Sequence, residues 1–369
     1  MRGHGMLISL PNTGSTDRNR SIYCMRRIAF VAVWIFLMLK LRSFFFEPIY
    51  LVNAMRSVAL HNDPTISQQI AKYNAAELVL NEDLFGPLKN DSVVIVVQVH
   101  TRVTYLSYLI GSLAQAYGIS TVLLIFSHDY YDKDIKKLVE TIDFCLVIQI
   151  FYPYPIHKHP KCLQDTLKSP AMRDKCNKTE FPYHNNQRSR AQMKHHWWWK
   201  ANFIFDQSEI TRYHSGNIES FKFKKKCLRD CYCISGLVLF LEEDYYVTKD
   251  FLYILKMMYK RTIDLCPQCN IYTLGRHGQR TPYQANCLKY LGDMRYAEVN
   301  VMPWTTANNM AFAFNRATWN NIRTCAEHFC SFGDYNYDQS LEHMSRECPE
   351  GKLINFSVKQ TRVFHTGAW

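Results

Sequence analysis

Three consecutive carboxylates, Glu242, Glu243 and Asp244, stand out in this 369-residue chain as residues whose type and spacing could do chemistry. They follow an apolar run at 236–241, GLVLFL, which predicts a strand buried on both faces. Adjacent like charges repel, so their grouping favours a positive ion at this strand end. A divalent cation such as Mg²⁺ or Mn²⁺ prefers oxygen ligands and could join the triplet to a diphosphate. The alternative is a solvated acidic turn.

The apolar pattern on the N-terminal side predicts the sheet that would hold this strand. Three further apolar runs predict buried strands, at 93–99, 121–126 and 146–150. Between them, helices are predicted at 102–117, with Gly118 as the C-cap, and at 132–141. Strands and helices that alternate with short connections predict an α/β fold with a Rossmann-like, mostly parallel, doubly wound central sheet.

Polar residues at the carboxyl ends of these strands are candidates for ligand binding, since ligands of such sheets bind beyond the strand ends. Gln98, His100 and Arg102 stand at the end of the first strand, and Asp129 follows the second. A parallel sheet would bring them to the same edge as the acidic triplet. Position alone leaves open the alternative that they are ordinary loop residues.

The charge of the chain invites a nucleic-acid partner, but its distribution argues against one. The formal net charge is +12, and lysine and arginine side chains neutralise phosphates. These residues gather in a short N-terminal segment that includes Arg26 and Arg27, and in a lysine run at 224–226. No basic stripe interleaved with aromatics occurs elsewhere, so we expect no nucleic acid. An anionic nucleotide donor needs only a few local cations.

Residues 28–39, IAFVAVWIFLML, are uninterrupted apolar, and aromatic residues resume at 44–46 after Lys40 and Arg42. A membrane-spanning helix needs about 20 apolar residues, which this segment reaches if the two basic side chains extend to the interface. The alternatives are a cleaved signal peptide and a buried core helix. No small-residue cleavage site follows, so we expect an uncleaved signal anchor at 28–46.

Arg26 and Arg27 flank the anchor on its N-terminal side, so the positive-inside rule places residues 1–27 in the cytosol. The remainder would then be luminal, as in a single-pass type II membrane protein. Residues 47–90 are polar with few apolar runs and are typical of a stem. The folded domain is expected at 91–369.

Glycosylation triplets and cysteines agree with a luminal domain. Triplets on the luminal side begin at Asn90, Asn177 and Asn355, whereas one at Asn19 lies on the cytosolic side. All of the 13 cysteines except Cys24 follow the anchor, and such a number suits an oxidising compartment. The sequence does not show which of them pair.

Three further motifs have both a chemical and a structural interpretation. A CxxC motif at 266–269 is compatible with a redox pair, half a zinc site or a small disulfide. A predicted helix at 187–206 contains tryptophans at 197–199, which either stack on a sugar or, as helix aromatics more often do, pack in the core. A lone histidine such as His365 is more often structural than a metal ligand.

Seven segments, in order along the chain, together resemble the N-acetylglucosaminyltransferase II family. They are VVIVVQVHTR (93–102), LLIFSHD (123–129), KHHWWWK (194–200), LFLEEDYYV (239–247), CPQC (266–269), DYNYD (334–338) and RVFH (362–365). The family adds a β1,2-linked N-acetylglucosamine to the α1,6-arm mannose of N-glycans. The resemblance implies a GT-A-type fold, a UDP-GlcNAc donor, an N-glycan mannose acceptor, Mn²⁺ as cofactor and a Golgi membrane location.

The resemblance also implies roles for individual residues. Asp244 and His365 would ligate Mn²⁺, with the diphosphate supplying other ligands. Asp338 would be the catalytic base that takes the proton from the mannose 2-hydroxyl, and an inverting transfer needs no carboxylate nucleophile. The implied nucleotide-sugar contacts are Gln98, Val99, His100, Thr101, Arg102, Asp129, Gln192, Met193, Lys194, His195, His196 and, across a one-residue gap, Arg280.

Three disulfides are implied by the same resemblance: Cys266–Cys269, Cys325–Cys348 and Cys162–Cys176. The chain departs from the family at an insertion, 217–234, to which we assign no function, and on the acceptor side at 307–309 and Tyr337. These departures leave two alternatives. One is a catalytically impaired relative that binds a UDP-sugar or a glycan, and the other is a GlcNAc transferase that acts on another mannose.

Overall fold

The computed structural model describes residues 64–89, 91–155, 185–212, 236–276, 297–333 and 336–367. Several expectations concern residues outside these ranges: the tail and anchor at 1–46, Asn90, Asn177, the pair Cys162–Cys176, the insertion at 217–234, and Arg280. Among the helices of the described ranges, none combines the length and the apolar character needed to cross a membrane.

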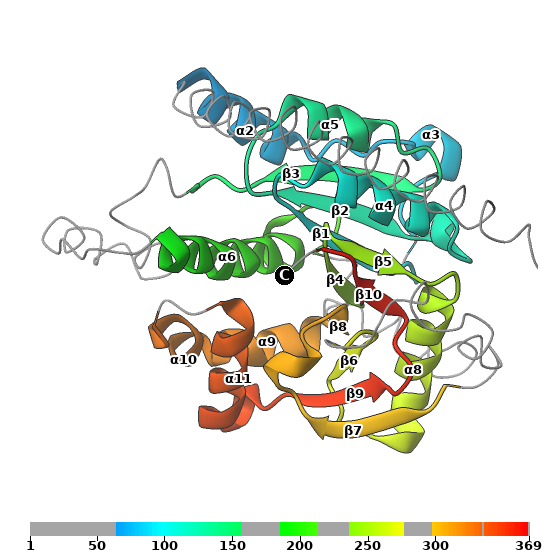
Figure 1. Ribbon diagram of the computed structural model, residues 1–369, viewed down its shortest axis with the longest axis vertical. Helices are drawn as coiled ribbons and strands as arrows, with labels where there is room; N and C mark the ends of the chain where they lie inside the picture. Colours follow the sequence, from blue (N-terminus) through cyan, green and yellow to red (C-terminus); the bar gives the residue numbers. More distant parts are fainter. Residues whose placement is uncertain are drawn as a thin grey trace, which may run out of the picture. The chain divides into compact units, whose positions relative to one another are not determined.

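An eight-stranded sheet lies at the centre of the described domain (Figure 1). Consecutive residues of a strand point to opposite faces, so Ile95 and Val97 pack into one core and Val94 and Val96 into another. The predicted parallel strands are confirmed. In spatial order this half of the sheet contains β3 (Leu146–Phe151), β2 (Leu123–His128), β1 (Val94–Val99) and β4 (Val238–Glu242).

The other half of the sheet is mixed in direction. β8 (Phe312–Phe314) is antiparallel to both β4 and β6 (Ile271–Thr273). β9 (Ile354–Val358) is parallel to β6, and β7 (Val299–Pro303) is antiparallel to β9. A separate antiparallel pair joins β5 (Tyr245–Val247) to β10 (Val363–His365). In spatial order after β4, the mixed half contains β8 (Phe312–Phe314), β6 (Ile271–Thr273), β9 (Ile354–Val358) and β7 (Val299–Pro303).

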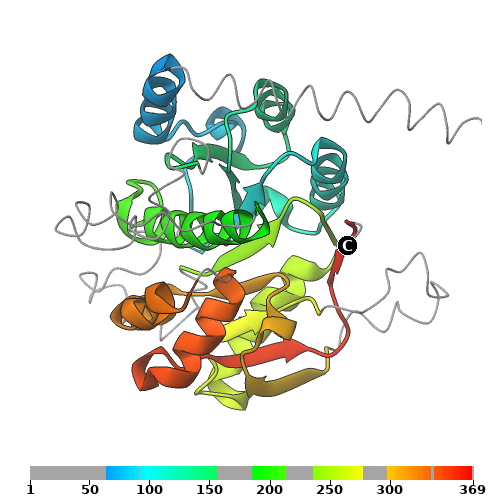
Figure 2. The same cartoon turned by 60° about the vertical axis from the view of Figure 1, so that its left-hand side comes forward.

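Helices cover both faces of the sheet (Figures 1 and 2). One core receives side chains from α4 (Val103–Ala114), α5 (Lys133–Glu140) and α8 (Phe251–Leu265). The other core receives them from α6 (Asn185–Asn202), α9 (Arg316–Thr324), α10 (Ala326–Ser331) and α11 (Tyr337–Glu347). Short turns of 3₁₀ or π type lie at Ile119–Thr121, Phe203–Gln207, Thr306–Asn308 and Pro349–Gly351.

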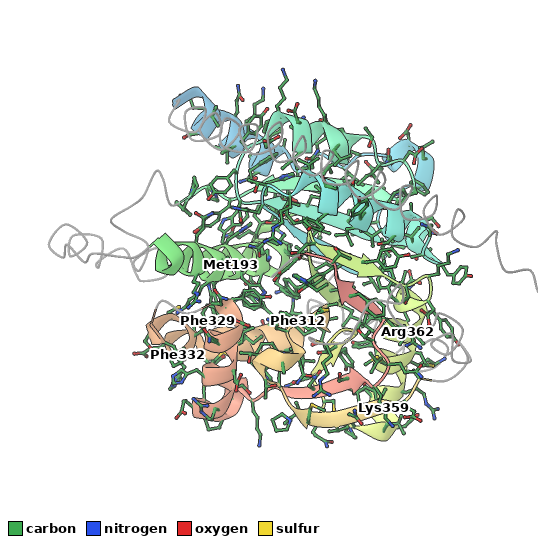
Figure 3. The ribbon with its side chains drawn as sticks, in the orientation of Figure 1. Met193, Phe312, Phe329, Phe332, Lys359 and Arg362 are labelled. Atoms are coloured by element: carbon green, nitrogen blue, oxygen red, sulfur yellow. A yellow bond between two sulfur atoms is a disulfide. The ribbon has the colours of Figure 1, made fainter. Side chains whose placement is uncertain are left out.

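Trp197 of α6 belongs to the core beneath that helix. Its ring lies 6.3 Å from the ring of Phe312, 5.8 Å from that of Phe329 and 5.5 Å from that of Tyr337, measured between centroids. Figure 3 labels the two phenylalanines on this side of α6. Trp198 packs on Trp319 in the same core. The packing interpretation of these two tryptophans is therefore confirmed.

Residues 64–89 pack on the sheet domain, although we expected them to be part of a stem. They contain α2 (Pro64–Ala76) and α3 (Glu82–Phe85). Ile66 and Ile70 of α2 are buried against Phe151 of β3, and Leu80 forms a β-bridge with Val147. The amphipathic spacing of so few apolar residues is inconspicuous in the sequence, which is why this segment resembled a stem.

The helices α4 and α5 lie within the ranges that the sequence predicted, but one predicted cap is wrong. The Asp132 side chain accepts hydrogen bonds from the backbone N–H groups of Asp134 and Ile135, as an N-cap residue of α5 does. α4 ends at Ala114 with Gln115 as its C-cap, so Gly118 is not the C-cap that we expected. Gly118 instead precedes the turn Ile119–Thr121, and its φ of 77° is in the left-handed region that favours glycine.

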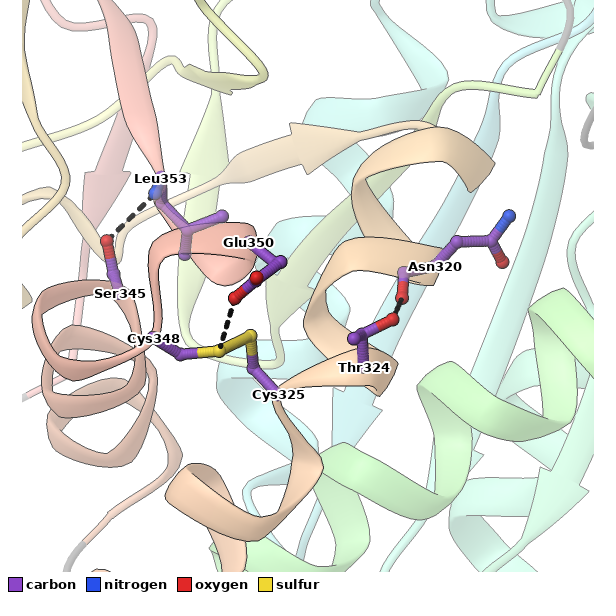
Figure 4. Close-up of a disulfide and its surroundings, with 7 residues drawn as sticks. All are labelled: Asn320, Thr324, Cys325, Ser345, Cys348, Glu350 and Leu353. Atoms are coloured by element: carbon purple, nitrogen blue, oxygen red, sulfur yellow. Dashed lines mark hydrogen bonds between the residues drawn. A yellow bond between two sulfur atoms is a disulfide. The ribbon is translucent and has the colours of Figure 1, made fainter.

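Two of the three expected disulfides lie in the described ranges and both are formed. Cys266–Cys269 follows α8 directly, and Cys325–Cys348 joins the end of α9 to the end of α11. Figure 4 shows the second bond beside Glu350. The CxxC motif is therefore a disulfide.

Asn355 is not an acceptor for glycosylation in the folded protein, contrary to our expectation. The residue is fully buried in β9, and its side-chain oxygen accepts a hydrogen bond of 2.9 Å from Thr273 Oγ1. The triplet around it is part of a strand of the central sheet. The three residues of a glycosylation triplet do not show whether its asparagine is buried in the folded protein.

Candidate active site

The parallel strands β1, β2 and β4 end at one edge of the sheet, and the predicted polar residues follow them there. Gln98 lies beside Glu242 in the register of β1 and β4. His100 follows β1, and Asp129 follows β2, where its N–H donates to the carbonyl of Val99. The sheet therefore brings the two groups of candidate residues together, as the sequence predicted.

Asp244 is the residue of the acidic triplet that turns toward His365. Its Oδ2 lies 3.1 Å from His365 Nε2 and also accepts a hydrogen bond from Arg102 Nη1. Its Oδ1 is buried and has no hydrogen-bond partner among the described residues. A carboxylate oxygen that is buried without a hydrogen-bond partner is available to bind a cation.

The pairing of β10 with β5 places His365 opposite Tyr245, next to Asp244. Thr366 completes the connection, since its N–H and its hydroxyl both donate to the carbonyl of Asp244 at 2.8 Å. The hydrogen bond from His365 to Asp244 raises the pKa of that imidazole. The site therefore favours positive charge beside the carboxylate.

Gly367 closes over the same carboxylate. A Cβ added at this position would lie 2.6 Å from Asp244 Oδ2, 2.9 Å from Arg102 Nη1 and 3.0 Å from His365 Cε1. The first two distances are shorter than a Cβ atom allows, so any residue other than glycine at 367 would have to displace the side chains of Asp244 and Arg102 or its own backbone. This close approach was not evident from the sequence.

Glu243 points away from Asp244 and holds the loop that follows β1. Its carboxylate accepts backbone N–H bonds from His100, at 2.7 Å, and from Arg102, at 3.2 Å. Burial raises the pKa of Glu243 to about 7, against the effect of the bond from His100. Glu243 therefore holds the loop after β1, and Asp244 is the member of the pair that faces His365.

Asp129 is the centre of a buried polar cluster at the ends of β1 and β2. It accepts a 2.9 Å bond from His100 Nδ1 and a second bond from His196 Nδ1. His196 Nε2 lies 2.7 Å from Ser127 Oγ. Burial lowers the pKa of His196, so the neutral ring donates to the carboxylate and accepts from the serine hydroxyl.

The charges of this cluster are held in a fixed state. Burial alone would raise the pKa of Asp129, but the imidazoles of His196 and His100 hold it well below its usual range. Burial would lower the pKa of His100, yet its bond to Asp129 raises it overall. An ionised Asp129 with donors around it is suited to orient the polar edge of a nucleotide.

Lys194 is turned away from this cluster, although its motif suggested a nucleotide contact. Its ammonium donates to the carbonyls of Cys330, Phe332 and Gly333, at distances of 3.0 to 3.3 Å. These carbonyls lie at the end of α10, where a cation satisfies the free acceptors of the helix terminus. In this structure Lys194 fastens α6 to α10.

The other residues of the implied nucleotide-sugar set differ in burial and in position. Gln192 bonds to the side chain of Tyr130, which follows Asp129 in the sequence. His195 is buried, Met193 is partly exposed on α6 (Figure 3), and Thr101 is exposed in the loop after β1. Val99 is buried in the core, so only its backbone can meet a ligand.

Glu242 and Asp338 lie at the start of α11. Glu242 Oε1 accepts a 2.8 Å bond from Tyr337 Oη, and Asp338 Oδ2 accepts a 2.8 Å bond from Asn309 Nδ2. Burial and the charges of Asp244 and Asp338 raise the pKa of Glu242. The three carboxylates therefore lie within electrostatic reach of one another.

Lys200 is a site residue that the sequence did not single out. It is buried on α6, and its Nζ donates to Gln98 Oε1. Lys200 is the last residue of the KHHWWWK motif, but its position in the motif did not distinguish it from the other polar residues there. A lysine four positions after His196 shares the helix face that meets Asp129, which was the available signal.

Asp244 and His365 fit a divalent cation. The unpaired Oδ1 of Asp244 and the imidazole of His365 are oxygen and nitrogen donors of the kinds that Mn²⁺ accepts. The Cys325, Cys348 and Glu350 group also brings three potential donors together, but its sulfurs are joined in a disulfide. That group is therefore no rival metal site.

Comparisons of this chain with a family model and with individual proteins agree on one family. The chain matches the family model described as N-acetylglucosaminyltransferase II (MGAT2) over residues 67–369. It is 33% identical over 312 residues to the alpha-1,6-mannosyl-glycoprotein 2-beta-N-acetylglucosaminyltransferase of Rattus norvegicus, covering 81% of this chain and 64% of the rat protein. For the Arabidopsis thaliana protein of the same name, identity is 31% over 268 residues, covering 71% and 55%.

This chain spans less than two thirds of the length of those relatives. Solved structures show a more distant likeness. S. aureus TarS 1-349 aligns with a TM-score of 0.37 and 10% identity over 74% of this chain and 60% of that one. Mouse xyloside xylosyltransferase 1 aligns with a TM-score of 0.34 and 11% identity over 70% and 83%.

Proposed function

Because the chain belongs to the N-acetylglucosaminyltransferase II family, we propose that it transfers N-acetylglucosamine from UDP-GlcNAc to an N-glycan. The acceptor is the 2-hydroxyl of the α1,6-arm mannose, and the product is a β1,2 linkage formed with inversion. The observation that carries this proposal is the contact between Asp244 and His365. It lies at the edge of the sheet where Asp129 and Asp338 also lie.

Asp244 and His365 would hold Mn²⁺ together with the diphosphate of the donor. The unpaired Oδ1 of Asp244 supports this assignment. The bound ion would neutralise the charge that develops on the departing UDP. Arg102, which now contacts Asp244, lies within the loop that follows β1 and can offer its guanidinium to a phosphate.

Asp338 would act as the base. As the mannose 2-hydroxyl oxygen attacks the anomeric carbon and the bond to UDP breaks, the hydroxyl proton passes to the Asp338 carboxylate. Asn309 Nδ2 and the N–H of Gln339 hold one oxygen each, at 2.8 and 2.9 Å. The residue lies in the first turn of α11, where the helix terminus favours a negative charge.

The donor pocket would take the nucleotide between the β1 loop and α6. Asp129 and its imidazole partners are ordered by mutual hydrogen bonds, so little rearrangement is needed when a nucleotide binds. We further propose that residues 28–46 anchor the protein in the Golgi membrane with this domain in the lumen. Carbonate extraction and protease protection of the full chain in membranes test that location.

The decisive experiment combines defined acceptors with one variant. The purified full chain is incubated with UDP-GlcNAc, Mn²⁺ and N-glycans that carry a free mannose on either the α1,6 or the α1,3 arm, and the product linkage is determined. We expect a β1,2 product on the α1,6 arm. Asp338→Asn should reduce transfer at least about 10²-fold, within the range for loss of a general base.

Binding of the donor distinguishes the two alternative functions. Asp338→Asn should bind UDP-GlcNAc as the unchanged chain does, by calorimetry, because the base does not hold the donor. Transfer only to the α1,3 arm would replace the proposed acceptor. Donor binding without transfer by the unchanged chain would indicate a binding protein, and undiminished transfer by Asp338→Asn would remove Asp338 as the base.

A further inference from the structure

Lys200 is buried between the donor and acceptor sides, and the reaction described above gives it no role. It lies near the end of α6 and is only 2% exposed. A buried ammonium is unfavourable unless neighbouring acceptors and opposite charges compensate for lost hydration. The groups that surround Lys200 therefore indicate what its charge does.

On the donor side, Lys200 holds Gln98. Its Nζ donates to Gln98 Oε1, and Gln98 Nε2 lies 3.5 Å from Asp129 Oδ1. Burial lowers the pKa of Lys200 to about 8, while the charges of Glu242 and Asp129 oppose that lowering. At neutral pH the side chain is therefore mainly an ammonium, and both carboxylates lie within its electrostatic reach.

On the acceptor side, Glu242 connects Lys200 to the start of α11. Glu242 is the register partner of Gln98, and its Oε1 accepts the 2.8 Å bond from Tyr337 Oη. Trp197, one turn before Lys200 on α6, stacks on the Tyr337 ring with the planes 6° apart. α6 therefore contacts the start of α11 through the Trp197 ring, and the charge of Lys200 acts on Glu242, which holds Tyr337.

We propose that Lys200 is a positioning residue, whose ammonium balances Glu242 so that Glu242 can hold Tyr337 at the end of β4. Asp338 follows Tyr337 directly, so the base is fixed relative to the strand that leads to Asp244. The effect on turnover rests on the proposed function, whereas the connection between α6, β4 and α11 does not.

Removing the charge tests the connection. Lys200→Met keeps the aliphatic stem and leaves Glu242 without its cation, beside Asp244 and Asp338. We expect kcat to fall on the order of 10²-fold, since a displacement of about 1 Å at a reacting group has that effect. The Kd for UDP in the presence of Mn²⁺ should rise by a smaller factor, because Gln98 loses its bond to Lys200 while Asp244 and His365 are untouched.

A second substitution should restore what the first removes. In Lys200→Met/Glu242→Gln the uncompensated charge is gone, and the amide oxygen can still accept the bond from Tyr337. We expect kcat at least about tenfold higher than in Lys200→Met, as for two residues that act through one interaction. A side chain that merely fills space would give a double variant no better than Lys200→Met.

Hydrogen exchange tests the connection between α6, β4 and α11 without an activity assay. Amides of residues 337–341, at the start of α11, should exchange faster in full-length Lys200→Met and recover in the double variant. Arg316→Met is the matched control, because Arg316 is a cation with 13% side-chain exposure that lies away from the site. Its Nη1 lies 3.0 Å from Asp206 Oδ1. Arg316→Met should lower the stability of the protein. It should neither speed exchange specifically at residues 337–341 nor lower kcat.

The outcomes separate the two proposals. Unchanged exchange at 337–341 in Lys200→Met, or a double variant without recovery, overturns the role of Lys200. If the unchanged chain transfers to no acceptor, the proposed function fails. The exchange data then still decide whether Lys200 holds the start of α11.

Discussion

Asp244 has one oxygen shared by Arg102 and His365 and a second oxygen that is buried without a hydrogen-bond partner among the described residues. The neighbouring Glu243 has both oxygens occupied by backbone N–H groups. Adjacent carboxylates thus have different chemistry because their side chains leave the chain in different directions. At this scale, function depends on the space left around Asp244.

Gly367 controls that space, so Gly367→Ala should weaken the metal site. The added methyl group overlaps Asp244 Oδ2 at 2.6 Å, and forced overpacking costs about 1–3 kcal/mol. We expect Mn²⁺ affinity, measured with UDP present by the electron paramagnetic resonance signal of free Mn²⁺, to fall about tenfold or more. Kinetic assays should show the same shift in the Mn²⁺ concentration for half-maximal rate.

Gly111→Ala is the control for this substitution. Gly111 lies inside α4, and a Cβ there meets nothing within 4 Å. The change should leave Mn²⁺ affinity alone and stabilise the helix by about 0.5–1 kcal/mol. Equal Mn²⁺ affinity in Gly367→Ala and the unchanged chain would show that Asp244 does not hold the ion.

At the scale of elements, the site is assembled from strand ends and from two segments that come from far along the chain. β10 brings His365 to β5, and α11 brings Asp338 to β4 through Tyr337. The position of α11 depends in turn on its own packing against α6 and α10 and on the Cys325–Cys348 bond at its far end (Figure 4). Stability of this helical group therefore bears on the base.

Removal of the Cys325–Cys348 bond should destabilise the domain more than removal of Cys266–Cys269. The bonds join cysteines separated by 23 and 3 positions, and a longer loop restricts the unfolded chain more. We expect Cys325→Ala/Cys348→Ala to cost about 3 kcal/mol and Cys266→Ala/Cys269→Ala about 2 kcal/mol. Urea unfolding curves give both values. The reverse ranking would mean that packing around the sulfurs, rather than loop length, sets the contribution.

At the scale of the whole molecule, buried histidines make folding sensitive to acid. Burial lowers the pKa of both His128 and His195 to about 3, from an ordinary value of 6.5. Below pH 6.5 the unfolded chain takes up these protons and the folded chain does not. Stability is therefore lost as the pH falls from 6.5 toward 3, by about 1.4 kcal/mol per pH unit for each such group.

His128→Gln should reduce this dependence by one proton. The amide can still donate to Gln149 Oε1, which now lies 3.0 Å from His128 Nε2. Between pH 6 and 4, the slope of the free energy of unfolding against pH should fall by about 1.4 kcal/mol per unit, measured by urea denaturation. An unchanged slope in His128→Gln would contradict a neutral, buried His128.

The sequence by itself determined the parallel half of the sheet, because buried strands and their crossover helices are local patterns of apolar residues. It also determined the strand ends at which Gln98, Asp129 and Asp244 lie, since parallel strands share one edge. The three-residue strands β6, β8 and β10 are too short to show a period. Their pairing, and with it the place of His365, is a property of the tertiary structure.

The tertiary structure also decided which similar residues share the site. Glu242, Glu243 and Asp244 are alike in sequence, but the turn after β4 sends them to Tyr337, to the β1 loop and to His365. Lys194 and Lys200 lie on one helix, and the helical rotation between them directs one to α10 and the other to Gln98. Residue type fixes what chemistry is available, and only the directions of side chains in the folded chain decide which groups meet.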